Sequence, residues 1–361
     1  MAEIQDIFAA HFEDYAAQRK LSSEQWKAAR SIILCRTAAL GAHVDICGHC
    51  GYQRISYNSC RNRHCPKCQS FSKERWLARQ REDLLDIHYF HVVFTVPLQL
   101  NPAFLHDQRS MYDLLFRASS ETVLELCADK KYLGAKPSVT AVLHTWGQNL
   151  QFHPHIHMLV TGGGLTPNGK WRDSKKKFFL PVRVLSAKFR GKFLALFKQK
   201  FPDTNQELLD VCRSKKWVVY CKPPFGSAEK VVAYLGRYTH RVAISNNRIL
   251  SLKDGKVTFL WRDYAHENQT KPMTLDAMEF IRRFLMHILP SGFRKIRHYG
   301  LTSAQDKKRR ISLCRRLTHS KVPKKFVAAD RLREIFGPDF NLCPCCGIGR
   351  LAREPPCLVK N

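Results

Sequence analysis

The segment FHPHIHMLV, residues 152–160, alternates imidazole and apolar side chains with a period of two. In an extended strand, residues two apart project from the same face, so His155 and His157 should point together while Ile156 and Met158 enter a core. We therefore expect a β-strand at HIHMLVTGGG, residues 155–164, with one buried face and one face that is free for chemistry.

A second strand is predicted at SVTAVLHTW, residues 138–146. Its alternation places Leu143 on the buried face and His144 on the other. His144 would become a third imidazole of the group if the two strands pair with these faces aligned. Gln148 and His153 are competing candidates for that position.

No aspartate or glutamate occurs between Asp129 and Asp173. A zinc hydrolase normally places carboxylates beside its histidines, and the His-Glu-x-x-His pattern is absent. A metal held only by neutral ligands keeps its full positive charge and can polarise an anionic phosphodiester. Imidazole suits Zn²⁺ or other transition ions better than Mg²⁺, so these residues leave the ion open. The alternative interpretation is a set of hydrogen-bonded structural histidines.

A tyrosine pair follows in VVAYLGRYTHR, where Tyr234 and Tyr238 stand four residues apart. Four residues of helix advance about 6 Å and turn about 400°, so the two phenols would lie one above the other. Core packing is the ordinary explanation for such a pair. Here Arg237, His240 and Arg241 add cations that can hold phosphate and favour phenolate, so we interpret the tyrosines as nucleophiles that attack phosphorus beside a metal.

Lysine and arginine outnumber aspartate and glutamate by 60 to 30, which gives a net charge of +30. Such an excess repels itself unless a polyanion is bound, so DNA or RNA is the first partner to consider. The acid-free segment 307–325 begins with four cations that we expect to hold backbone phosphate, and a solvated charged tail is the alternative. These cations are Lys307, Lys308, Arg309 and Arg310.

Two CxxC pairs separated by fourteen residues predict a structural zinc site. The four expected ligands are Cys47, Cys50, Cys65 and Cys68. Cys60 and His64 lie between the pairs and could replace one ligand. A closed four-ligand site leaves no position for a substrate water, so this zinc should stabilise the fold. The later segment CPCCG, with Cys343 and Cys346, could be half of a second site completed by Cys357, His319 or Cys314.

The irregular alternation of helices and strands, without a glycine-rich phosphate loop, favours an α+β fold with a mainly antiparallel sheet. Ser22 and Gln25 predict a capping box at the start of a helix. No run of about 18 apolar residues could span a bilayer, and the acidic N-terminal segment lacks a signal-peptide core, so we expect a cytoplasmic protein with no membrane partner.

Four segments occur in an order that resembles a known family. They are CGHCGYQRISYNSCRNRHCPKC, HTWGQNLQFHPHIHMLVTGGG, YLGRYTHRVAISNNRI and FIRRFLMHILPSGFRKIRHYG. Over about residues 30–302 the chain resembles the two-tyrosine HUH rolling-circle transposases of bacterial insertion sequences, the IS-ninety-one type. The resemblance implies a division into N-terminal helices (1–45), a zinc-binding module (46–80), an HUH nuclease domain (81–302) and a basic C-terminal region with a CxxC (303–361).

The resemblance also implies a chemistry. HUH enzymes have a five-stranded antiparallel sheet with flanking helices, use Mg²⁺ or Mn²⁺, and nick single-stranded DNA by tyrosine attack, which leaves a 5′-phosphotyrosine and a free 3′-hydroxyl. Carried onto this sequence, the metal pair is His155 and His157 and the nucleophiles are Tyr234 and Tyr238. His144 as a third ligand follows the order of three-histidine relaxases.

The implied partners are single-stranded DNA at element ends and target DNA, in a bacterial cell where the protein would associate with the nucleoid. A relaxase or replication initiator with the same chemistry is the nearest alternative. A zinc-dependent DNA-binding regulator without catalysis is a third interpretation, because basic patches and aromatic side chains can bind DNA while the histidines serve only the structure.

Overall fold

The computed structural model covers the 361-residue chain. It describes residues 2–175, 179–225, 230–231, 234, 236, 243–263, 267–322, 333–334, 337, 339 and 341–353, of which 70–72, 75 and 223–225 are described by their backbone alone. Within these ranges, no helix is both long enough and apolar enough to cross a membrane.

A five-stranded sheet in the order β12-β4-β5-β3-β8 forms the centre of the larger lobe, and every neighbouring pair is antiparallel. The strands are β3 (Tyr89–Thr95), β4 (Ser138–Trp146), β5 (Phe152–Thr161), β8 (Val219–Phe225) and β12 (Ile296–Gly300). The expected α+β class with a central antiparallel sheet is confirmed. The strand expected at 138–146 is also confirmed. The strand expected at 155–164 is found as β5, which begins earlier, at Phe152, and ends at Thr161, whereas β12 was not anticipated.

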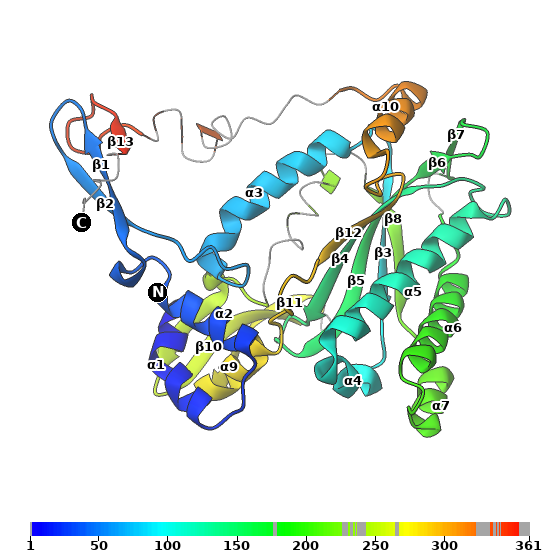
Figure 1. Ribbon diagram of the computed structural model, residues 1–361, viewed down its shortest axis with the longest axis horizontal. Coiled ribbons are helices and arrows are strands. Elements are labelled where there is room, and N and C mark those ends of the chain that lie inside the picture. The colour runs from blue at the N-terminus through cyan, green and yellow to red at the C-terminus, as the bar shows by residue number, and fades with distance from the viewer. Residues whose placement is uncertain are drawn as a thin grey trace, which may run out of the picture.

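Four helices cover one face of this sheet, as Figure 1 shows. They are α4 (Asn101–His106), α5 (Gln108–Ala128), α6 (Val182–Lys200) and α7 (Gln206–Ser214). The expected core residues Ile156 and Met158 are fully buried here, and Leu143 lies in the same cluster. Phe189 and Phe193 of α6 also pack into it. The period-two pattern of the strands therefore assigned their buried face correctly.

Helix α3 (Pro66–Asp83) passes over the opposite face of the sheet. Its Leu77 packs against Tyr89 of β3, Leu159 of β5 and Val231. At the far end of α3, helix α10 (Lys307–Thr318) joins a separate small cluster through Ile311. The histidine-bearing face of the sheet therefore lies beneath α3 and the segment around residue 231.

A second core unites distant parts of the sequence. It combines α1 (Ile4–Ala17), α2 (Ser23–Leu34), α9 (Ala277–Leu285) and a sheet in the order β11-β10-β9. Its strands are β9 (Ile249–Lys253), β10 (Lys256–Asp263) and β11 (Gln269–Asp276). The expected capping box is confirmed, since the Gln25 N–H donates to Ser22 Oγ at 3.2 Å and the Ser22 N–H donates to Gln25 Oε1 at 3.0 Å.

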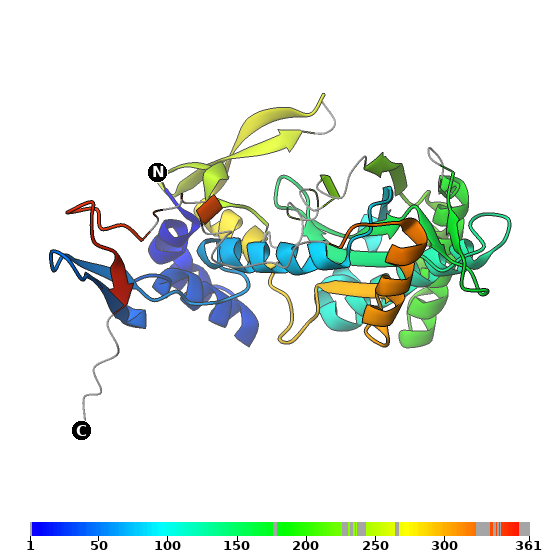
Figure 2. The same cartoon turned by 90° about the horizontal axis from the view of Figure 1, so that it is seen from above.

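A third, small sheet has the order β13-β1-β2 and lies at one end of the molecule, as Figure 1 and Figure 2 both show. Its strands are β1 (Ala42–Cys47), β2 (Gln53–Tyr57) and β13 (Leu351–Arg353). Short elements complete the fold: β6 (Gly163–Leu165), β7 (Trp171–Asp173), η1 (Ala38–Leu40), η2 (Leu98–Leu100) and η3 (Asn246–Arg248). The expected domain boundaries stay predictions.

Candidate active site and metal centres

Three histidines converge on the sheet face that is turned away from α5 and α6. The register of β4 and β5 sets His144 directly opposite His155 and Val142 opposite His157. One nitrogen from each of the three histidines lies within 4.8 Å of the others, and the two Nε2 atoms of His155 and His157 are 3.0 Å apart. The strands thus pair with their faces aligned, and the structure brings the three expected metal ligands together.

His153, one of the two competing candidates for the third position, lies outside this group of ligand atoms. The carbonyl oxygen of His153 accepts a hydrogen bond from His155 Nδ1 at 2.6 Å. This bond fixes the His155 ring and turns its Nε2 toward His157, which is the way proteins usually orient a histidine that holds a metal. His153 therefore acts through its backbone, whereas the role of Gln148 stays a prediction.

A fourth histidine, His91 of β3, was missed by the sequence interpretation. Its Nε2 lies 2.9 Å from His157 Nδ1, and the two rings stack with centroids 5.1 Å apart. The signal was present, because His91 and Thr95 alternate along β3 with the buried Phe90 and Phe94 and so share the face of the other histidines.

Tyr234 reaches the same cluster. Its hydroxyl lies 2.7 Å from His91 Nε2 and 3.0 Å from His91 Nδ1. Residues 230, 231, 234 and 236 are helical, and Val231 is fully buried against Leu77 of α3. A Cβ atom on Gly236 would approach Leu77 Cδ1 to 3.0 Å, so this segment packs closely on α3. That packing places the Tyr234 phenol over the histidines.

The second tyrosine of the expected pair, Tyr238, lies outside the described residues, as do Arg237, His240 and Arg241. Their roles as nucleophile and as DNA-binding cations stay predictions.

Burial controls the protonation of the histidine cluster. It lowers the pKa of His91 and of His155 to about 3, and it holds the pKa of His157 well below its usual range, with a further contribution from His144. Neutral imidazole is the form that binds a metal ion. A cluster that stays neutral at physiological pH can therefore accept a cation without first releasing protons.

One cation, Lys295, lies next to this cluster and was also missed. Its Nζ stands 4.7 Å from the centroid of the Trp146 ring, and burial, followed by the charge of Arg63, lowers its pKa to about 7. Its backbone carbonyl accepts a hydrogen bond from the Leu143 N–H at 3.0 Å, which fixes it beside β4. A lysine so desolvated would gain from an anionic phosphate nearby.

The cysteines form two clusters rather than the single site expected. The first contains Cys35, Cys60, Cys65 and Cys68, whose sulfur atoms lie within 4.8 Å of one another. Cys35 ends α2 and Cys65 begins α3, so this cluster joins the two helices. Cys68 Sγ lies 3.5 Å from the sulfurs of both Cys35 and Cys60. Cys60 is the replacement ligand that the sequence left open, and Cys35 was not anticipated.

The predicted union of Cys47 and Cys50 with Cys65 and Cys68 is wrong. Cys47 and Cys50 lie at the tip of the β1–β2 hairpin, whereas the first cluster lies at its base. The strand between them has six residues and so spans about 17 Å. Zinc–sulfur bonds of about 2.3 Å cannot bridge that distance. Sequence spacing alone does not reveal the length of the hairpin between two CxxC pairs.

The second cluster contains Cys47, Cys50, Cys343 and Cys346, also within 4.8 Å of one another. Cys47 and Cys50 were not among the partners that the sequence suggested for Cys343 and Cys346. Of those, Cys314 is buried in another cluster beside Ile311, His319 does not join the group, and Cys357 lies outside the described residues.

The four expected DNA-binding cations of α10 separate into two pairs. Lys307 forms an ion pair with Asp83 of α3, and Arg310 donates to the carbonyl of Ser303 at 2.8 Å. Lys308 and Arg309 are exposed. DNA contact stays a prediction for all four, and the exposed pair is the better placed for it.

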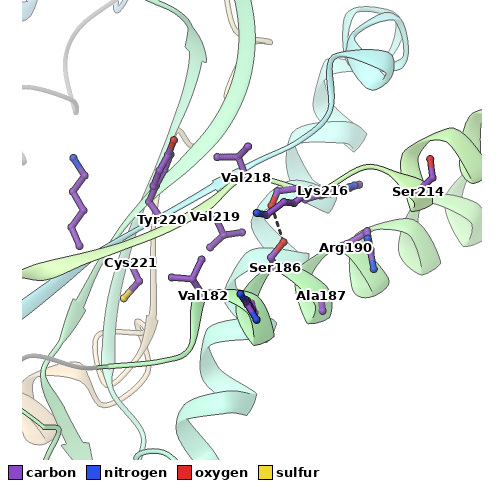
Figure 3. A pocket seen from close by; sticks show the side chains of 13 residues that line it. Val182, Ser186, Ala187, Arg190, Ser214, Lys216, Val218, Val219, Tyr220 and Cys221 are labelled. Atoms are coloured by element: carbon purple, nitrogen blue, oxygen red, sulfur yellow. Dashed lines mark hydrogen bonds between the residues drawn. The ribbon is translucent and has the colours of Figure 1, made fainter. Parts of the chain in front are cut away.

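A cleft of about 980 Å³ lies between α6 and the edge strand β8. Figure 3 shows Val219 and Cys221 pointing toward α6, while Tyr220 points to the other side of the strand. Four cations line the cleft and no carboxylate does; they are Arg183, Arg190, Lys216 and Lys222. Tyr220 is 54% exposed and stands opposite Val93 of β3, so the cleft adjoins the face that carries the histidines.

Comparisons with known proteins agree with this arrangement. Residues 138–310 match the family described as "Putative transposase", and residues 7–96 match the "Transposase zinc-binding domain". The second match covers the whole first cysteine cluster, which supports structural zinc there. No solved structure matches the chain.

Two curated proteins are similar over most of their length. The chain is 44% identical to "Putative transposase y4qJ" of Sinorhizobium fredii (strain NBRC 101917 / NGR234), over 97% of this chain and 94% of that protein. It is 29% identical to "Transposase for insertion sequence element IS801" of Pseudomonas savastanoi pv. phaseolicola, over 74% of this chain and 68% of that protein. The chain therefore belongs to the IS-ninety-one family of insertion-sequence transposases.

Proposed function

We propose that this transposase nicks and rejoins single-stranded DNA at insertion-sequence ends by tyrosine transesterification, as in rolling-circle transposition. The proposal rests on membership of the transposase family and on one contiguous set of contacts. The Tyr234 hydroxyl is 2.7 Å from His91 Nε2, which is in turn 2.9 Å from His157 Nδ1. The proposed nucleophile and the imidazoles proposed to bind the metal thus share one face of the sheet.

In the proposed step the Tyr234 phenol oxygen attacks phosphorus and the bond to the bridging 3′ oxygen breaks. The phenolic proton ends on the leaving 3′ oxygen, so the products are a 5′-phosphotyrosine and a free 3′-hydroxyl. No oxidant or energy-rich cofactor is consumed, and attack by another 3′-hydroxyl reverses the bond changes and rejoins the strand.

The chain's own residues prepare this attack. His91 holds the Tyr234 hydroxyl by a hydrogen bond through Nδ1, while its Nε2 bonds to His157, and it is a positioning residue. The nearby buried cation Lys295 would stabilise the charge on the scissile phosphate. Tyr238 would supply the second nucleophile, which can cut one end while Tyr234 holds the other.

The three histidines His144, His155 and His157 would hold the catalytic ion. All three donors are imidazoles, which suit transition ions better than Mg²⁺, and Mn²⁺ is the transition ion of the two that the family resemblance implies. When bound, the ion would polarise the scissile phosphate. The hydrogen bond from His155 Nδ1 to the His153 carbonyl keeps one ligand nitrogen turned toward the site.

The cleft beside β8 is the proposed path for single-stranded DNA. Proteins that bind single strands combine a basic groove with aromatic rings on which bases stack. Here four cations line the cleft, and the exposed Tyr220 ring lies on the other side of β8, toward the face that carries the histidines. Lys222 lies opposite His91 in the register of β8 and β3, so the path would lead to the nucleophile.

The test is a covalent-adduct assay with labelled single-stranded element ends and Mn²⁺, followed by mapping of the modified peptide. We expect adducts on peptides containing Tyr234 or Tyr238, and none when DNA lacks an element end. Tyr132→Phe is a matched control, since this partly buried ring packs against the main core and has Lys131 Nζ 5.9 Å from its centroid. DNA binding without any adduct at wild-type Tyr234 and Tyr238 would favour the regulator interpretation.

A further inference from the structure

Two CxxCG segments from opposite ends of the chain fold into matching turns. In each, the N–H of the glycine donates to the carbonyl of the first cysteine at 3.0 Å, from Gly51 to Cys47 and from Gly347 to Cys343. Both glycines have a left-handed φ, +71° and +64°. Such a turn aims two cysteine side chains at one point, which is the local geometry of half a zinc site.

The two turns face each other. Cys47 Sγ is 3.8 Å from Cys346 Sγ, although the residues are 299 positions apart, and Cys50 Sγ is 3.7 Å from Cys343 Sγ. The sulfur of Cys346 also accepts a hydrogen bond from the Gly349 N–H at 3.3 Å. Each sulfur therefore meets the opposite turn, as tetrahedral coordination by two pairs of cysteines requires.

Gly349 shows how closely the two turns approach. A Cβ atom at this position would lie 2.4 Å from Cys47 Sγ and 2.6 Å from His49 Cβ. Only glycine leaves room for the first turn to lie against the backbone of the second. The glycine at position 349 of the C-terminal segment thus permits the close contact between the two turns.

The sheet around these turns is too small to be stabilised by its core alone. β13 pairs with β1 over three residues, from Asp45↔Arg353 to Cys47↔Leu351. The buried hydrophobic cluster consists of Cys47, Cys343 and Leu351, with Cys346 packed against it. Three short strands with so little apolar burial require a further source of stability, such as a metal ion.

We propose that Cys47, Cys50, Cys343 and Cys346 bind a second Zn²⁺, which fastens the C-terminal segment to the tip of the β1–β2 hairpin. Four thiolates are the donor set that selects zinc, and a closed site leaves no position for a substrate. The site is distinct from the cluster of Cys35, Cys60, Cys65 and Cys68, because it needs both ends of the chain. Its role is to hold β13 in place, independently of DNA cleavage.

Zinc content per chain tests this proposal. Cys343→Ser/Cys346→Ser should lose one equivalent of zinc relative to wild type, and Cys35→Ser/Cys60→Ser should lose a different one. Cys345→Ser is the matched control, because this neighbouring cysteine is exposed and lies outside both clusters. Equal zinc in Cys343→Ser/Cys346→Ser and Cys345→Ser would overturn the proposal.

A second measurement uses the wild-type chain and so does not depend on a variant that folds. After zinc is removed with a chelator, mild oxidation should link Cys47 or Cys50 to Cys343 or Cys346, which peptide mass spectrometry detects. Bound zinc should prevent this link. A link that forms equally readily with zinc bound and after chelation would contradict a zinc site.

A basic pocket of about 560 Å³ at the base of the same hairpin carries an independent proposal. It is lined by Arg36, Arg61, His43 and Arg353 and by no carboxylate. Arg36 and Arg61 both have a left-handed φ, 60° and 53°, a conformation that costs free energy and is common at binding sites. Arg353 Nη2 donates to His43 Nε2 at 2.6 Å, so side chains from β13 and β1 meet there.

We infer that this pocket binds a phosphate group of the DNA, away from the catalytic face; the inference rests on the proposed function. Arg353→Ala and Arg61→Ala should each lower the affinity for element-end DNA several-fold, with zinc content unchanged. Arg350→Ala is the control, since Arg350 is exposed three residues away and outside the pocket. Equal DNA affinities of Arg353→Ala and Arg350→Ala would overturn the inference. Failure of the proposed function would look different: wild-type protein would form no covalent adduct, yet its affinity for DNA would still depend on Arg353.

Discussion

Replacement of His91 by leucine tests the link between the nucleophile and the histidine cluster. His91 is 4% exposed, and its imidazole bonds to the Tyr234 hydroxyl through Nδ1 at 3.0 Å and to His157 Nδ1 through Nε2 at 2.9 Å. Leucine is similar in size, so the substitution removes these hydrogen bonds without opening a large cavity. The expected loss is therefore in positioning rather than in the fold.

The magnitude follows from the two hydrogen bonds. Each contributes about 0.5–1.5 kcal/mol, so the pair accounts for about 1–3 kcal/mol. At about 1.4 kcal/mol for each tenfold change in rate, His91→Leu should slow adduct formation by about 5- to 150-fold. The loss of a residue that orients a metal ligand costs about 10- to 100-fold in metal affinity or activity, which is the same range.

The assay measures the rate of adduct formation with labelled single-stranded DNA over a range of Mn²⁺ concentrations. His91→Leu should lower the rate and raise the Mn²⁺ concentration needed for half-maximal activity. His88→Leu is the matched control, because His88 precedes the same strand and bonds instead to Ser174 Oγ at 3.0 Å. Equal rates for the two variants would refute the positioning role of His91.

Four further predictions concern the metal ligands, the C-terminal zinc, the basic helix and acid stability. His155→Ala should abolish cleavage yet leave DNA affinity within a few-fold of wild type, since many cations bind the phosphates. Unchanged cleavage would show that His155 is not a ligand of a catalytic metal. Gly349→Ala should speed release of one zinc to a chelating dye, whereas Gly48→Ala, whose Cβ would meet nothing within 4 Å, should not; equal release would contradict the close packing of the turns. Lys308→Ala/Arg309→Ala should make the slope of log affinity against log salt less steep by about 1.4 for single-stranded DNA, if both side chains contact phosphates. An unaltered slope would mean that these side chains are solvated and do not contact DNA. Burial lowers the pKa of His287 to about 4 in the folded protein, so the unfolded state binds the proton more tightly. The free energy of unfolding should therefore fall as the pH drops from about 6.5 toward 4. His287→Gln should reduce this loss, measured by urea unfolding, by up to about 3 kcal/mol, and a variant with the same pH dependence as wild type would contradict the role of His287.

The local pattern of the sequence predicted the centre of the fold well. The alternation along β4 and β5 identified which face is buried, because side-chain direction in a strand depends only on position. The alignment of His144 with His155 needed one further condition, the register of the two strands, which the structure supplies. The family resemblance supplied the five-stranded antiparallel sheet.

The features that were missed depend on contacts between distant segments. The pairing of Cys47 and Cys50 with Cys343 and Cys346 cannot be inferred from spacing, because the closest CxxC pair in sequence lies at the other end of a hairpin. Likewise, β12 is short and joins β4 from 150 residues later in the chain, so no local pattern distinguished it. His91 was recognisable from its alternation alone, but its role appears only through Tyr234.

The most direct test of the central claim is the covalent adduct formed by the double variant Tyr234→Phe/Tyr238→Phe. Wild-type protein, labelled single-stranded element ends and Mn²⁺ should give an adduct that maps to one of these tyrosines, and the double variant, with DNA affinity retained, should give none. An adduct from the double variant as abundant as that from wild type would contradict the assignment of the nucleophile and, with it, the proposed mechanism.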